Sequence, residues 1–177
     1  MEKWQNFYIQ RMGEDTESDP YPVYESVSDL GIWCKDIPFK LFEKVKTPAV
    51  RTWADEHGDD EYIPSTGLYL ESYTMQVEFG CKKTSTVDNV RLMVGQFLSY
   101  LRSSGMLKIY SSYTRIGRQD VRLSSVGNEV TWKTSSRVDG GTEEFAIFTV
   151  EFKVNDPVSD VAPLFSDGVI TNLTTSS

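Results

Sequence analysis

One long amphipathic helix constrains the fold of this chain more than any other sequence feature. Residues 88–105, DNVRLMVGQFLSYLRSSG, repeat apolar side chains at helical spacing: Val90, Met93, Val94, Phe97, Leu98 and Leu101. Asp88 is placed to cap the amino end of the helix, and Gly105 is placed to end it. Because such a stripe is stable only when buried, the helix requires a partner surface.

Most of the remaining pattern is typical of β-strands. The clearest run is residues 68–82, in which Tyr73, Met75, Val77 and Phe79 alternate with polar residues. Residues 144–155 alternate similarly, but their second face is half apolar and half charged, as for a strand partly covered by a partner. Shorter strands are predicted at 4–12, 21–27, 31–34, 39–46, 106–112, 121–126 and 130–134, with a hairpin turn at Gly127-Asn128. The expected fold is mainly β with one flanking helix, in the α+β class.

The chain is expected to form one domain. Residues 1–157, which include an N-terminal extension, contain every strongly patterned segment, and no internal repeat or Pro/Gly-rich linker divides them. Residues 158–177 are small, polar and weakly patterned. We expect these last residues to be a C-terminal arm that is ordered only against a neighbour, or not at all.

Charge is distributed in blocks along the chain. Residues 1–80 carry 7 Lys/Arg against 16 Asp/Glu, residues 81–138 carry 10 against 3, and residues 139–177 carry 1 against 7, within an overall net charge of −8. The blocks indicate either faces of opposite sign, which steer self-association, or segments that the sheet interleaves and neutralises. The negative total disfavours a general nucleic-acid binder.

Catalytic and cofactor signatures are absent from the sequence. His57 is the only histidine, and no GxSxG, phosphate-binding loop, dinucleotide fingerprint or CxxC is present, so we expect neither an enzyme nor a cofactor. Cys34 and Cys81 are too few and too far apart to indicate a disulfide framework or a zinc site. No signal peptide or membrane span is recognisable, so synthesis and folding in a reducing cytoplasm are expected.

An acidic loop surrounds the single histidine in residues 51–64. Its carboxylates are Asp55, Glu56, Asp59, Asp60 and Glu61. They could hold a cation, although the EF-hand spacing is not met and a specific metal is disfavoured. The alternative is an ion-pair patch against Arg115, Arg118 or Arg122 on an adjacent copy. The basic segment that holds these arginines could bind nucleic acid in isolation, but its acidic flanks favour a solvated or subunit-facing surface.

The order of these segments resembles that of a known family. A strand leads into WADEHGDDEYIP, and the strand YTMQVEF, one amphipathic helix, KIYSSYTRIGRQDVRL and the closing strand FTVEFKVNDP follow. Over residues 51–157 this order is similar to the small tail proteins of tailed bacteriophages, in particular phages of Bacteroides-type bacteria. The group shares the tail-tube fold, a β-sandwich or barrel flanked by one helix.

The resemblance implies a structural virion protein without catalytic residues. It implies a homo-oligomeric ring, commonly of six subunits, in the virion tail, where it contacts neighbouring tail proteins and DNA passes through the lumen without specific binding. A heterologous interface repeated by rotation closes such a ring. Tube, terminator, connector and distal-tail proteins all remain open, and the alternative is a carbohydrate- or receptor-binding β-sandwich module, for which Trp4, Trp33, Trp53 and Trp132 would have to form an exposed platform.

Overall fold

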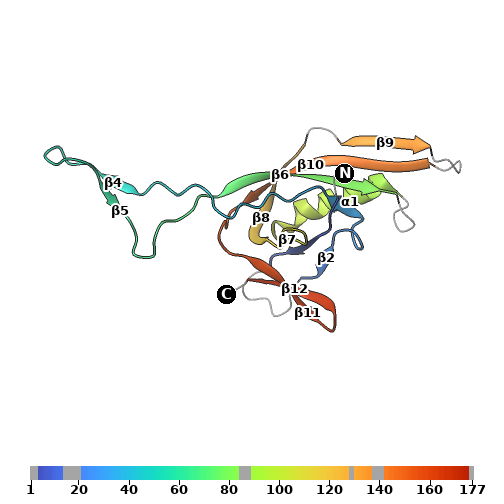
Figure 1. The fold of residues 1–177 in the computed structure, drawn as a ribbon. Helices are drawn as coiled ribbons and strands as arrows, with labels where there is room; N and C mark the ends of the chain where they lie inside the picture. The colour runs from blue at the N-terminus through green and yellow to red at the C-terminus, as the bar shows by residue number, and fades with distance from the viewer. Residues whose placement is uncertain (1–3, 14–20, 84–88, 128–129, 137–141, 176–177) are drawn as a thin grey trace.

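The protein is mainly β, with one helix held inside a curled sheet (Figure 1). The computed structural model describes residues 4–13, 21–83, 89–127, 130–136 and 142–175. Its elements are β1 (Phe7–Arg11), β2 (Val23–Glu25), β3 (Ile32–Cys34), β4 (Ala49–Arg51), β5 (Asp60–Tyr62), β6 (Tyr73–Lys82), α1 (Val90–Ser104), β7 (Met106–Ser111), β8 (Gly117–Val126), β9 (Thr131–Ser136), β10 (Thr142–Val154), β11 (Val161–Ser166) and β12 (Val169–Thr175). The predicted fold class, mainly β with one helix, is confirmed.

Eight strands form one antiparallel sheet that curls into a half-barrel. The order is β2-β1-β7-β8-β10-β6-β3, and β9 adds to the free part of β10. The two ends of the sheet meet just before β1, where Gln5 and Cys34 exchange backbone hydrogen bonds of 2.7 and 3.0 Å. The curl creates a concave face that α1 fills.

The core lies between α1 and this concave face. The phenylalanine rings of β1, β6, α1 and β10 pack together with centroid separations of 5.2 to 6.3 Å, and they are Phe7, Phe79, Phe97 and Phe148. The alternation predicted for both long strands is confirmed, because the expected inward residues of β6 and β10 are buried. Rings of this kind are the largest apolar groups available, so they dominate the burial that stabilises the fold.

The helix follows its predicted stripe closely. Val90, Val94, Phe97 and Leu101 are buried, while the flanking apolar positions pack at the edge of the core. The N-cap is Asn89, whose side-chain oxygen accepts a hydrogen bond from the backbone N–H of Leu92 at 3.0 Å. The predicted cap, Asp88, lies outside the described residues. Gly105 ends the helix as predicted, with the positive φ of 67° that glycine adopts without strain.

The hairpin predicted at Gly127-Asn128 is wrong. β8 and β9 do not pair with each other, and both instead pair with β10, one after the other along the same side. Val126 is opposite Val150, and Thr131 is opposite Ile147, so β8 and β9 lie end to end along β10. The strand β10 is long enough to pair with both β8 and β9, and this pairing overrides the turn preference of the local sequence.

The expectation of an extended C-terminal arm is also wrong. β11 and β12 form an antiparallel hairpin with Val161 and Leu173 fully buried. The backbone N–H of Leu173 donates to Oε1 of Gln10 at 3.0 Å, and Nζ of Lys108 donates to the carbonyl of Leu173 at 2.8 Å. These contacts join the hairpin to β1 and β7, so residues 161–175 belong to the folded body.

Candidate assembly surfaces

A long extension leaves the body between β3 and β6 (Figure 1). It comprises residues 41–72, with the paired strands β4 and β5 near its far end. Closer to the body, Lys46 N–H donates to the Tyr69 carbonyl and Glu71 N–H to the Lys44 carbonyl, both at 2.7 Å. The predicted strand at 39–46 is wrong, because only Val45 forms a bridge there, with Leu70. The prediction for 68–82 starts too early, since β6 begins at Tyr73.

The extension carries an unusual share of the exposed apolar side chains. Eight of them lie on it: Leu41, Phe42, Val50, Trp53, Tyr62, Ile63, Leu68 and Tyr69. Phe42 and Tyr62 are 73% and 71% exposed. A two-stranded ribbon is at best marginally stable alone in water, and contiguous exposed apolar surface marks interaction sites. These side chains have the chemistry of a surface that another molecule covers.

The tip of the extension, residues 48–67, is acidic as well as apolar. The predicted site carboxylates Asp55, Glu56, Asp59, Asp60 and Glu61 are all exposed here, against one cation, Arg51. The guanidinium of Arg51 lies 5.1 Å from the ring of Trp53. Within the described part of the chain, no three or more His, Cys, Asp or Glu side chains gather to hold a metal ion. The structure thus places five of the predicted interface residues together on one projecting surface.

Arg118 anchors the base of the extension. It is 2% exposed, and its guanidinium forms an ion pair with Asp160 and donates to the Lys40 carbonyl at 3.1 Å. Lys40 N–H in turn donates to the hydroxyl of Tyr73 at 3.1 Å. One buried cation therefore joins β8, the start of the extension and the C-terminal hairpin. This use inside the chain keeps Arg118 from the neighbour-facing position that the sequence suggested.

The other two predicted arginines occupy different settings. Arg115 is exposed in the turn after β7, with a positive φ of 59°. Arg122 is half-buried in β8, and it donates to the Leu123 carbonyl at 3.1 Å. Among the described residues, no ion pair joins any of these arginines to the tip carboxylates. The predicted pairing concerns a second copy and stays a prediction.

An apolar groove of about 400 Å³ lies on the outer face of the sheet, at β3, β6 and β10. Its main apolar lining is Trp4, Trp33, Phe145 and Ile147. The ring of Trp4 packs directly on Gly80, where a Cβ would lie only 3.1 Å from it. Two cations border the groove. Lys82 forms an ion pair with Glu143 at 3.5 Å, and the ammonium of Lys133 lies 5.9 Å from the ring centroid of Phe145.

Sequence reasoning missed this groove. Trp4 and Trp33 are far apart in the sequence, and they become neighbours only because the Gln5–Cys34 bridge joins the two ends of the sheet. The available signal was the outer face of β10, where Phe145 and Ile147 are apolar although the side chains opposite the core are normally polar in such a sheet.

Both cysteine thiols face the core and are unsuited to chemistry. Burial raises the pKa of Cys34 to about 12 and that of Cys81 to about 11. A thiol with such a pKa is almost entirely protonated at neutral pH, and the thiolate is the nucleophile and the metal ligand.

In the described part of the chain, no helix has the length and apolar character needed to cross a membrane.

Comparisons of the chain with protein-family models, with curated proteins and with solved structures each found no match.

Proposed function

We propose that this protein is a structural subunit of a bacteriophage tail, which assembles with copies of itself into a ring around the DNA channel. The observation that carries the proposal is the extension, because it projects away from the body (Figure 1) and eight of its apolar side chains are exposed. Exposed apolar side chains on a projecting ribbon are typical of a surface that a partner covers. The mainly β sheet curled around one helix is compatible with the tail-tube resemblance of the sequence.

Charge distribution adds to this proposal. The tip carries five carboxylates and one arginine, a net charge of −4, whereas residues 81–138, from the end of β6 through β9, carry 10 Lys/Arg against 3 Asp/Glu. Complementary charges on distant parts of one subunit favour contacts between unlike surfaces of neighbours. Contacts between unlike surfaces close into rings when the rotation allows, and six subunits is the number that the resemblance implies.

Imaging and a deletion variant test the proposal. Wild-type protein at high concentration should give a ring with a central hole in negative stain and a multiple of the subunit mass in native mass spectrometry. Replacing residues 48–67 with Asn-Gly keeps the Lys46–Tyr69 pairing and should give a folded monomer. A wild-type chain that stays monomeric at every concentration would refute the proposal.

A carbohydrate- or receptor-binding module is the second candidate. The observation that favours it is the pair Trp4 and Trp33 in one groove, because indole rings stack on sugars. The polar side chains lining that groove are Lys82 and Glu143, which already pair with each other. Glycan binding by the monomeric deletion variant, blocked by Trp33→Ala, would favour this candidate over the ring.

A further inference from the structure

We infer that the groove on the outer sheet face receives the tip of the extension from a second copy of this chain. This inference rests on the self-assembly proposed above and names its two surfaces. The occupant is the β4–β5 end of the extension, with Trp53 and Tyr62 as its apolar anchors.

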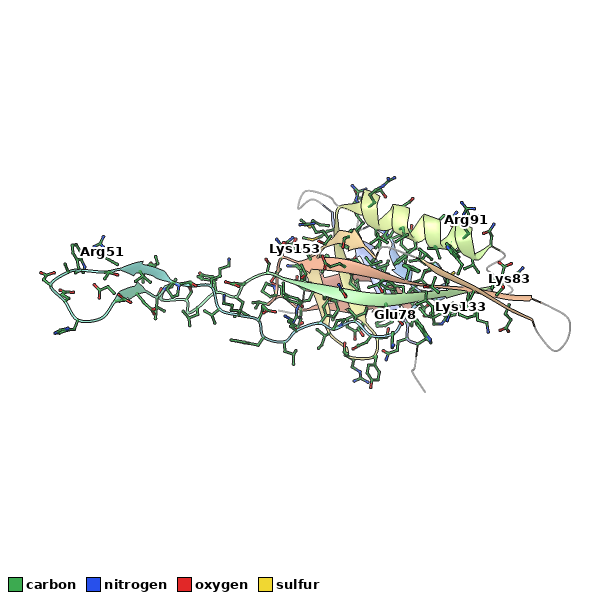
Figure 2. All side chains as sticks on the ribbon, turned by 90° about the horizontal axis from the view of Figure 1, so that it is seen from above. Arg51, Glu78, Lys83, Arg91, Lys133 and Lys153 are labelled. Atoms are coloured by element: carbon green, nitrogen blue, oxygen red, sulfur yellow. The ribbon has the colours of Figure 1, made fainter. Side chains whose placement is uncertain are left out.

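The two surfaces lie toward opposite ends of the molecule. Figure 2 shows Arg51, in β4, at one end, and Lys133, at the groove rim, on the far side of the body. The tip projects away from the body, so it does not reach the groove of its own chain. A contact between them therefore requires two molecules, joined head to tail through unlike surfaces.

The chemistry of the two surfaces is complementary. Trp53, Tyr62 and Ile63 are exposed on the tip, at 47, 71 and 55%, and each needs an apolar partner to leave water. The groove offers aromatic and aliphatic walls, and its volume is within the range of pockets that enclose such groups, about 300–1,000 Å³. Lys82 is already paired with Glu143, so Lys133 is the rim cation that the tip carboxylates would meet after docking.

The groove fits the tip better than the arginine segment that the sequence suggested. Of those arginines, Arg118 is buried and Arg122 is half-buried with a backbone partner. Arg115 and Tyr113 are exposed in one turn, and neither of them lines the apolar groove. An interface core requires apolar anchors in a pocket, with charges on its rim.

Cross-linking between two different variants tests the inference. One preparation carries Glu61→Cys at the tip, next to the anchor Tyr62, and the other carries Lys133→Cys at the groove rim. The native thiols are buried with raised pKa values, so a short bismaleimide would label only the new cysteines. We expect a covalent dimer in the mixture and none in either variant alone. The matched control replaces Lys133→Cys with Tyr113→Cys, which is also exposed and lies in the alternative segment.

A second measurement uses the strength of association. Tyr62→Ala and Ile147→Asp should each weaken self-association at least about tenfold in sedimentation, whereas Leu92→Ala, on the exposed face of α1, should leave it unchanged. Oligomers that cross-link through Tyr113→Cys but not Lys133→Cys, or that tolerate both groove and tip variants, would overturn the inference while the ring proposal stands. A wild type that is always monomeric would overturn both.

Discussion

The packing of the C-terminal hairpin on the body can be tested at Gly117. A Cβ at this position would lie 2.4 Å from the carbonyl oxygen of Val161 and 2.6 Å from its Cγ2. The first of these is a backbone atom, so β11 must move rather than a flexible side chain. Overpacking of this kind typically costs about 1–3 kcal/mol. Gly117→Ala should therefore lower the free energy of unfolding by at least about 1 kcal/mol.

Gly95→Ala is the matched control, because it adds the same methyl group in open space. Nothing lies within 4 Å of a Cβ at Gly95, which is in the interior of α1. Alanine is favoured over glycine in a helix by up to about 1 kcal/mol, so this variant should be more stable than the wild type. Urea denaturation followed by circular dichroism measures both changes. Equal midpoints for Gly117→Ala and the wild type would show that β11 does not pack against β8 as described.

Three further predictions concern the core and its titratable groups. Phe97→Ala and Leu101→Ala should each cost about 2–5 kcal/mol in urea denaturation, because both side chains are buried, and losses below about 0.5 kcal/mol would contradict that burial. Desolvation raises the pKa of Asp120, so its ionised form destabilises the fold. Asp120→Asn should therefore raise stability at pH 7, with the difference vanishing as the pH falls below about 4, where the unfolded chain also protonates. Cys34 and Cys81 should resist thiol reagents at pH 8 and react once urea unfolds the chain, and rapid labelling of the native protein would contradict their burial.

Periodicity predicted the parts of the fold whose burial is set by nearby residues. The stripe on α1 and the inward faces of β6 and β10 were correct, because side chains at fixed spacing meet one continuous core. The extension could not be predicted in the same way. Tyr62 and Ile63 look like strand residues in composition, but composition does not say whether a second strand, the body or another molecule covers them.

Contacts distant in sequence account for the other differences. The sequence predicts Arg118 to be a surface cation, yet it is buried because Asp160 and the Lys40 carbonyl compensate its charge. The weak patterning of residues 158–177 predicts an arm, and within the hairpin that they form only Val161 and Leu173 are fully buried. Neither case leaves a local signal, since each partner lies far away along the chain.

The way in which the hairpin docks also affects how the chain folds. Gln10, near the start, and Leu173, near the end, are hydrogen-bonded across 163 positions. β1 likewise needs β7, which follows the extension and the helix. Such non-local pairing is slow, on the order of milliseconds to seconds for comparable β proteins. The body is completed only when β12 has paired with β11, so the apolar extension is already synthesised and exposed while the domain that anchors its base is unfinished.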